Sequence, residues 1–259
     1  MLDVYHWEPN AHQGKPIIAL YEKGVEFTSH YIDLLNFEQV SPAYLAVNPQ
    51  GIVPVLVHDG VLITESAMMC EYIDARFPGP PLRPDDPFGR WRMRWWCRYM
   101  DDYFSPSLSM GGWKSFMGPM ARRKDTAEIE RFLRRIPVRE MHTCWSTAIY
   151  DTFTEEQLAE SRRRVAVGIQ RLEQGLGESP YLAGADYSLA DINAFATVYA
   201  LPLSHPELCN EEATPNMLRW LRDIHARPSI EKTFRLSRMR FAERVREMRD
   251  RLGLPATGA

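Results

Sequence analysis

Residues 8–16 (EPNAHQGKP) have the composition of a binding turn, yet they contain no side-chain nucleophile. They lie between two apolar runs, residues 2–5 and 17–20, of which the second resembles the start of a helix. The turn holds no Ser, Cys or Tyr, whereas the side chains of His12 and Gln13 carry N–H donors. The start of a helix also attracts anions through its free N–H groups and its dipole. The turn therefore offers hydrogen-bond donors rather than a nucleophile.

Two further segments carry groups that could bind a ligand. Residues 48–54 (NPQGIVP) place Pro54 at the start of an apolar run, where a proline marks either a sheet edge or a cis bond that exposes the preceding backbone. Glu65 and Ser66 lie where a strand pattern changes into a helix pattern. Such a junction either holds an anion at the free N–H groups of the helix or simply caps the helix.

These groups are positioned by elements whose hydrophobic period alternates over the first eighty residues. The predicted elements are strand 2–6, helix 14–23, strand 26–32, strand 53–58, strand 61–64 and helix 65–77. The first three form a βαβ unit, whose short connections favour a parallel pair of strands. Asp59-Gly60 suits the tight turn of a hairpin between the last two strands.

The rest of the chain shows helical patterns. The predicted helices are residues 88–100, 154–176, 188–199, 214–227 and 230–252. Ser188 and Asp191 predict a capping box at the buried start of one of these helices, which is a local structural role. The sequence thus predicts an α/β domain over residues 1–80, a polar linker over 81–87 and an all-α domain over 88–259.

Composition excludes several classes of function. The net charge is −3, and the 31 basic residues are interspersed with 34 acidic ones, so no concentrated positive surface for nucleic acid is expected. The four cysteines are widely spaced and form no C-x-x-C pair, which gives neither a zinc site nor a disulfide framework and favours the cytoplasm. No apolar run approaches the ~20 residues that span a bilayer.

Three motifs in their order resemble the glutathione S-transferase family. They are residues 48–54 (NPQGIVP), 63–66 (ITES) and 188–191 (SLAD), which together span nearly the whole chain. The resemblance implies a thioredoxin-like N-terminal domain followed by an all-α C-terminal domain. Within the family the chain is most similar to bacterial glutathione-dependent β-aryl ether cleaving enzymes (β-etherases) of lignin degradation. That similarity is carried by residues 20–27 (LYEKGVEF), 37–39 (FEQ), 64–66 (TES), 70–72 (CEY), 82–88 (LRPDDPF) and 226–228 (ARP).

The resemblance implies a set of residues that bind glutathione. The backbone of Val53, turned outward by a cis bond to Pro54, pairs with the cysteinyl amide. Ser66 and the helix N-terminus hold the γ-glutamyl carboxylate, and Glu65 meets the ammonium. Gln39 corresponds to a position that reaches the glycyl end, with an exposed loop residue as the alternative. Glutathione is a co-substrate in this family, and no metal is implied.

Catalysis in such a site requires a thiolate, which a hydrogen-bond donor stabilises. The ether-cleaving relatives have Asn-Ser where this chain has His12 and Gln13. The Gln13 amide or the His12 ring can still donate to sulfur, and the imidazole could also take the thiol proton. The alternative is that both side chains face solvent or a subunit partner and that the thiol is activated poorly. Tyr5 is a weaker candidate, because packing explains it better.

The aromatic aryl-ether substrate is expected between the domains. Residues 105–119 contain two prolines and three glycines and do not readily continue a regular helix, so their side chains are pocket candidates. The residues predicted to contact the substrate are Met110, Trp113, Met117 and, in an insertion over about residues 123–153, Trp145, with packing in the core as the alternative for this aromatic and methionine-rich region. The insertion could also form a lid or a partner surface.

The implied reaction is attack by the glutathione thiolate on the carbon that bears an aryloxy group next to a ketone, with loss of a phenol. Two other functions stay open: an auxiliary, non-catalytic subunit of a dimeric transferase, which the His12-Gln13 departure favours, and a transferase or dehalogenase for other electrophiles. A dimer is expected, either with a second copy or with a homologous transferase.

Overall fold

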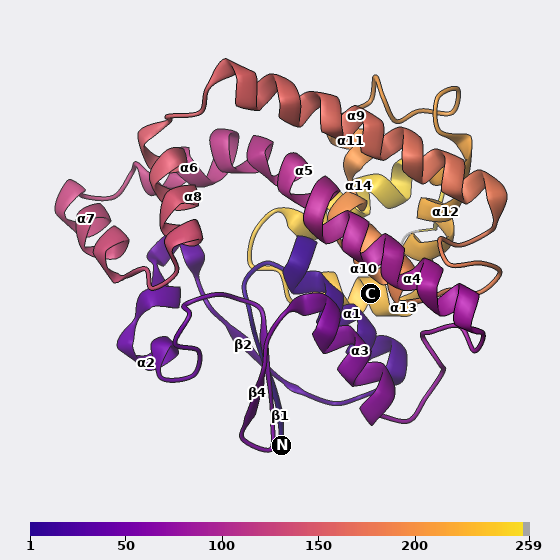
Figure 1. Cartoon of the computed structure of the whole chain (residues 1–259), viewed down its shortest axis with the longest axis horizontal. Coiled ribbons are helices and arrows are strands. Elements are labelled where there is room, and N and C mark those ends of the chain that lie inside the picture. Colours follow the sequence, from indigo (N-terminus) through magenta and orange to yellow (C-terminus); the bar gives the residue numbers. More distant parts are fainter. Residues whose placement is uncertain (256–259) are drawn as a thin grey trace.

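The computed structural model describes residues 1–255, so residues 256–259 of the predicted helical domain lie outside the described residues. The first part of the chain forms a small sheet with helices, and the remainder is helical (Figure 1). The elements of the first part are β1 (Leu2–His6), α1 (Ala11–Lys23), β2 (Thr28–Tyr31), η1 (Leu34–Asn36), η2 (Glu38–Val40), α2 (Pro42–Leu45), β3 (Val55–His58), β4 (Val61–Ile63) and α3 (Ser66–Arg76).

The sheet has four strands in the order β2-β1-β3-β4. β1 and β2 are parallel, as the βαβ prediction requires, and β3 is antiparallel to both β1 and β4. The predicted hairpin turn is confirmed, because Asp59 and Gly60 have φ values of 50° and 81°, the positive values that a tight two-residue turn needs. α1 and α3 pack together beside the sheet, where they bury Val4, Leu56 and Ile73 (Figure 1).

The described residues after β4 contain helices and one isolated bridge, between Tyr181 and Gly184. The helices are α4 (Pro87–Tyr99), η3 (Met100–Phe104), α5 (Ser105–Gly112), η4 (Trp113–Met117), α6 (Gly118–Ala121), α7 (Thr126–Arg135), α8 (Arg139–Tyr150), α9 (Glu155–Glu178), α10 (Leu189–Val198), α11 (Leu201–Ser204), α12 (Pro215–His225), α13 (Pro228–Phe234) and α14 (Phe241–Arg251). Residues 230–252, predicted as one helix, are divided by a turn over residues 235–240. No helix within residues 1–255 is long and apolar enough to cross a membrane.

Residues 105–119 are helical but do not form one regular α-helix, which agrees with the prediction. A single helical path runs from α4 to α6, and it widens into π turns at η3 and η4. In these turns the N–H of Ser105 donates to Met100 O and the N–H of Gly118 donates to Trp113 O. Each π turn ends two residues before a proline, Pro106 or Pro119, so the widened turn relieves the clash that a proline ring makes with the carbonyl four residues earlier.

The start of α10 has the predicted capping box. Asp191 is fully buried, and one carboxylate oxygen accepts from the N–H and hydroxyl of Ser188 at 2.9 and 3.0 Å. The other oxygen accepts from the N–H of Leu182 at 3.0 Å and the indole N–H of Trp220 at 2.9 Å. Burial raises the pKa of Asp191 to about 6, and the four donors oppose this rise. The carboxylate therefore fixes the entry of α10 to α12 and to the loop after α9.

α9 approaches the long helical path closely because two of its glycines face large side chains. A Cβ on Gly168 would lie 2.0 Å from the ring of Phe104, and a Cβ on Gly175 would lie 2.5 Å from Trp96. Both aromatic residues are buried. Phe104 belongs to η3, so this contact also fixes the position of the first π turn.

We expect Gly168→Ala to lower the free energy of unfolding by about 1–3 kcal/mol, because the added methyl group overpacks the contact with Phe104. Gly177→Ala in the same helix is the matched control, since the nearest atom to its Cβ would be Asn216 Nδ2 at 3.4 Å. That control should gain up to about 1 kcal/mol from helix propensity. Urea unfolding of the three proteins measures both effects, and equal stability of the two variants would contradict the close packing.

Candidate active site at the start of helix α1

The turn between β1 and α1 is held by a buried carboxylate. Glu8 is fully buried, and its Oε1 accepts from the hydroxyl of Tyr31 at 2.7 Å and from the N–H of Arg238 at 3.0 Å. The hydroxyl of Ser237 donates to its Oε2. Trp7 packs edge-on against Phe241 with ring centroids 6.3 Å apart. The C-terminal segment thus fixes the turn that precedes α1.

His12 and Gln13 lie in the first turn of α1, and both are partly exposed. Asn10, the residue at the helix cap, makes no side-chain cap bond, so the positive end of α1 stays available to a ligand. The side chain of Gln13 makes no hydrogen bond to any described residue. The structure therefore brings the two predicted donors to one helix start, and their catalytic role stays a prediction.

A buried ion pair lies directly beneath His12. The ammonium of Lys15, whose side chain is 0% exposed, pairs with Oδ1 of Asp101 from η3 and lies 3.1 Å from Nδ1 of His12. The pKa of His12 is lowered to about 4, because desolvation of the partly exposed imidazole and the Lys15 charge disfavour the imidazolium, while Asp101 partly opposes them. His12 is thus neutral near pH 7. Our sequence analysis missed Lys15 and Asp101, although a lysine directly before the apolar run 16–20 was a usable signal.

Residues 48–54 form a loop that presents an unpaired backbone. The Val53–Pro54 bond is cis, one of the two arrangements that the sequence allowed. Ile52 O accepts from the hydroxyl of Tyr44 at 2.6 Å and from the amide of Asn48 at 2.8 Å, which secures the loop from its own side. Val53 N–H and C=O have no partner within residues 1–255. This strand-like backbone is free to pair with an extended ligand.

Glu65 and Ser66 precede α3 in a strained backbone. Glu65 has φ 62° and ψ 104°, a conformation that costs a non-glycine residue about 1–3 kcal/mol. It makes no side-chain cap bond, and neither side chain has a hydrogen-bond partner among the described residues. The alternative that the pair simply caps α3 is therefore wrong. An exposed carboxylate, a hydroxyl and free N–H groups meet here, a combination suited to a zwitterionic ligand.

Gln39 is buried, with 3% of its surface exposed, so the alternative of an exposed loop residue is wrong. Neither its amide oxygen nor its amide nitrogen has a hydrogen-bond partner in the structure. The backbone carbonyl oxygen of Gln39 lies 3.0 Å from the position that a Cβ on Gly51 would take. η2 therefore packs against the 48–54 loop. A buried amide without partners costs free energy, and the role of Gln39 in ligand binding stays a prediction.

Two of the predicted substrate side chains, Trp113 and Trp145, lie in one aromatic cluster. Trp145, 2% exposed, packs edge-on against Trp113, with centroids 5.0 Å apart, and against Phe132 at 4.9 Å. Phe132 in turn stacks on Phe37 at 3.8 Å, so α7 and α8 pack against the segment that carries Gln39 (Figure 1).

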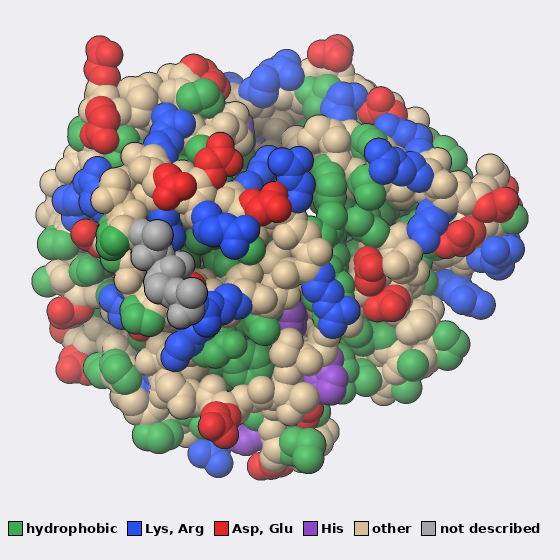
Figure 2. Space-filling model, turned by 180° about the vertical axis from the view of Figure 1, so that it is seen from behind, with side chains coloured by type: hydrophobic (Ala, Val, Ile, Leu, Met, Phe, Trp, Pro, Cys, Tyr) green, Lys and Arg blue, Asp and Glu red, His purple; other side chains and the backbone are tan. Residues whose placement is uncertain are grey.

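Met110 lies on α5, three residues before Trp113, and Met117 ends η4, four residues after it. Met117 is 7% exposed, and Met110 is half-buried. Seen from behind, hydrophobic side chains gather between the α7–α8 region and the rest of the molecule (Figure 2). This face supplies an apolar wall, while contacts with a substrate stay a prediction for all four residues.

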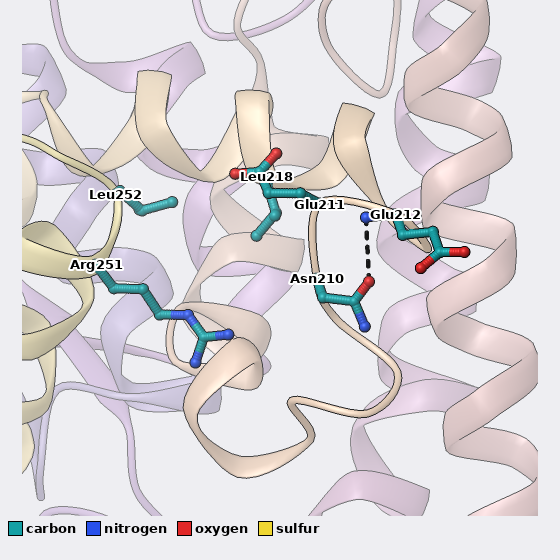
Figure 3. A pocket seen from close by; sticks show the side chains of 6 residues that line it. All are labelled: Asn210, Glu211, Glu212, Leu218, Arg251 and Leu252. Atoms are coloured by element: carbon teal, nitrogen blue, oxygen red, sulfur yellow. Dashed lines mark hydrogen bonds between the residues drawn. The ribbon is translucent and has the colours of Figure 1, made fainter.

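A separate cavity of about 430 Å³ lies on another part of the molecule (Figure 3). Its lining residues come from the loop before α12, from α12 and from the end of α14: Asn210, Glu211, Glu212, Leu218, Arg251 and Leu252. None of them belongs to the groups described above. Among the described residues there is no cluster of three or more His, Cys, Asp or Glu side chains that could hold a metal.

Two family models match the chain. The glutathione S-transferase N-terminal domain matches residues 5–81, and the glutathione S-transferase C-terminal domain matches residues 136–228. Together they cover more than half of the sequence. The chain belongs to the glutathione S-transferase family, and the predicted fold is confirmed.

Individual members of the family show which proteins this chain is similar to. The chain is 39% identical to Protein LigF of Sphingobium sp. (strain NBRC 103272 / SYK-6) over 245 residues, which are 92% of this chain and 94% of the relative. The crystal structure of the β-etherase LigF from Sphingobium sp. strain SYK-6 matches with a TM-score of 0.87 and 38% identity, over 91% of this chain and 99% of that one. Glutathione transferase F7 from Populus trichocarpa, 22% identical with a TM-score of 0.69 over 90% and 97% of the two chains, shares the fold.

We expect Gln39→Met to raise the free energy of unfolding of the ligand-free protein by about 1 kcal/mol, because it removes an unpaired buried amide while keeping a similar volume. Asn48→Leu is the matched control. Asn48 is as deeply buried, but its amide donates to Ile52 O and its oxygen accepts from Gln50 N at 3.1 Å, so its loss should cost about 1–2 kcal/mol. Urea unfolding distinguishes the two, and equal losses would mean that ordered water pairs with Gln39.

Proposed function

We propose that this chain is a glutathione-dependent β-aryl ether cleaving enzyme that acts on lignin-derived aromatics carrying an α-ketone. The similarity to the β-etherase LigF over both halves of the chain is the observation that carries the proposal. The site supports it, because a turn with donors and no nucleophile suits an enzyme whose nucleophile arrives with its co-substrate. We assign residues 1–80 to glutathione binding and the helical residues after 87 to the aromatic substrate, in a cytoplasmic protein.

Glutathione binds across the loop 48–54 and the start of α3 in this proposal. The unpaired backbone of Val53, beside Pro54, receives the cysteinyl amide, and Glu65 and Ser66 take the ammonium and carboxylate of the γ-glutamyl group. The glycyl end meets the amide of Gln39. The orientation sets the cysteinyl sulfur toward the start of α1, where the donors lie.

The reaction is a displacement at carbon. A free thiol has a pKa near 8.5, and lowering that pKa by two units requires about 2.7 kcal/mol, which a good donor and a helix N-terminus supply together. The thiolate of glutathione forms a C–S bond to the carbon next to the ketone, and the C–O bond to the aryloxy group breaks. The phenolate leaves with the electron pair and takes a proton from solvent. Met110, Trp113, Met117 and Trp145 form the apolar surroundings of the aryl groups.

We expect the purified chain, given glutathione and a β-aryloxy ketone, to release the phenol, and His12→Ala and Gln13→Ala each to lower the rate about ten-fold or more by removing a donor to the thiolate. His142→Ala, at an exposed position on α8, controls for the loss of a histidine elsewhere. Chromatography of the phenol measures turnover.

The other outcomes separate the competing functions. Phenol release only after mixing with a homologous transferase would support an auxiliary subunit. Turnover of chlorinated substrates without ether cleavage would support a dehalogenase. Wild-type rates in both donor variants would mean that the sulfur is activated elsewhere.

We also propose that the protein forms a dimer, with a second copy or with a homologous transferase, through one apolar patch. The patch consists of exposed aromatic side chains about one turn apart on α4: Phe88, Trp91 and Trp95. α3 and α4 are joined by a bidentate pair, in which Arg94 donates to Glu71 at 3.0 and 2.8 Å. Exposed aromatic side chains grouped on one helix face are more typical of an interface than of a monomer surface.

The substitution Trp91→Arg should therefore convert the dimer into a monomer, because it places a charge in the centre of the apolar patch. Trp91 is 57% exposed, so the change should not affect folding. Tyr150→Arg, at a residue 58% exposed on α8, serves as the control. Analytical ultracentrifugation gives the oligomeric state, and a dimer that survives Trp91→Arg would place the interface on another surface.

A further inference from the structure

The ion pair beneath His12 decides which role that imidazole can take. We propose that Lys15, held by Asp101, is a positioning residue that keeps the proton of His12 on Nε2, so that His12 donates a hydrogen bond to the glutathione sulfur and does not act as its base. This inference rests on the proposed function, since it concerns the activation of glutathione at the same site.

The tautomer follows from the donor inventory. The ammonium of Lys15 carries only hydrogens, so at 3.1 Å from Nδ1 of His12 it can only donate. Nδ1 is then the acceptor and has no proton of its own. A neutral imidazole has one N–H, which must lie on Nε2. The side chain of His12 is 42% exposed, so the ring remains open to a ligand.

The same geometry excludes a carboxylate–histidine pair of the kind that makes histidine a base. Asp101 Oδ1 lies 3.7 Å from Nδ1 of His12, beyond hydrogen-bond distance. That oxygen pairs with Lys15 instead, and Asp101 Oδ2 accepts from the amide of Asn193 at 3.4 Å. In a basic histidine, a carboxylate accepts from Nδ1–H and stabilises the imidazolium. Here a cation occupies that position and has the opposite effect.

The surrounding titratable groups do not reverse this effect. Cys70 of α3 and Cys97 of α4 lie near the ion pair, and burial raises the pKa of the Cys97 thiol to about 12 and that of Cys70 further. Both thiols are therefore uncharged near pH 7, and Lys15 and Asp101 are the charges that face His12. With a pKa of about 4, His12 stays neutral over the pH range in which a thiol ionises.

The chemical step is then a balanced ionisation without a protein base. The S–H bond of bound glutathione breaks, its proton passes to water, and the electron pair stays on sulfur, where Nε2–H of His12 donates to it. The thiolate next forms the C–S bond and expels the phenolate. The pH–rate profile should show one rise, which follows the ionisation of the thiol. It should show no second transition near 6.5, the ordinary pKa of histidine.

Three variants of the full-length protein test the donor role. His12→Gln keeps an N–H donor that cannot take a proton, so it should recover most of the activity lost in His12→Ala. The double variant Lys15→Met/Asp101→Leu removes the ion pair without leaving either charge alone in the interior.

Nitrogen-15 NMR of histidine-labelled protein reads the tautomer directly and requires no substrate. Wild-type protein should show His12 protonated on Nε2 and titrating well below pH 6, and the double variant should titrate closer to 6.5. A wild-type His12 protonated on Nδ1, or a His12→Gln variant as inactive as His12→Ala, would overturn the inference. Glutathione that does not bind at all would instead overturn the proposed function, so the two failures are distinguishable.

Discussion

A buried ammonium needs a carboxylate, and in this chain the carboxylate comes from the other half of the molecule. Lys15 is enclosed in α1, and its partner Asp101 lies 86 residues further along the chain, in η3. An unpaired charge at this depth would cost several kcal/mol, so the halves are stable together only in the register that joins these two groups. Lys15 is also one turn from His12. The ion pair that joins the two halves of the molecule therefore also fixes the surroundings of the candidate site.

Other contacts between the two halves of the molecule also hold α1 in place. Arg227 donates two hydrogen bonds of 2.7 Å to Glu22 at the end of α1, and Glu8 before α1 accepts from the segment that follows α13. α1 also packs along α10, which is buried on nearly all sides and fixed at its start by Asp191. α1 is thus tied at both ends and along one side, so its first turn has little freedom to move when a ligand binds.

Local patterns predicted the elements of this fold, whereas the site depends on contacts that local patterns do not contain. The strands and hairpin followed from periodicity and from Asp59-Gly60, and the loop before Pro54 and the junction at Glu65 followed from short motifs. The π turns did not, because Pro106 and the glycines near it favour an interruption unless the widened turn is already foreseen. Asp101 lies within such a turn. A prediction that assumed a regular α-helix would therefore have placed its side chain on a different face.

The aromatic cluster and Gln39 were beyond local reasoning for a related cause. Phe37, two residues before Gln39, packs against Phe132 of α7 and Trp145 of α8, which lie about a hundred residues away in the chain. Nothing in residues 37–39 alone distinguishes a buried amide from an exposed one. A short motif therefore identified Gln39, whereas its burial is seen only in the structure.

The absence of a hydroxyl at the start of α1 is therefore less of a loss than the sequence alone suggests. The ion pair of Lys15 and Asp101 is neutral as a whole, so at the distance of a bound sulfur its field is that of a small dipole and falls off quickly. Its effect is strongest on His12, which it touches and holds in a neutral form with one proton pointing away. In the reaction that we propose, the positive potential at the sulfur comes from the free N–H groups of α1 and from the donors of His12 and Gln13. The thiolate in that proposed reaction is stabilised through hydrogen bonds rather than through net charge, and the departing phenolate is left to be protonated by water.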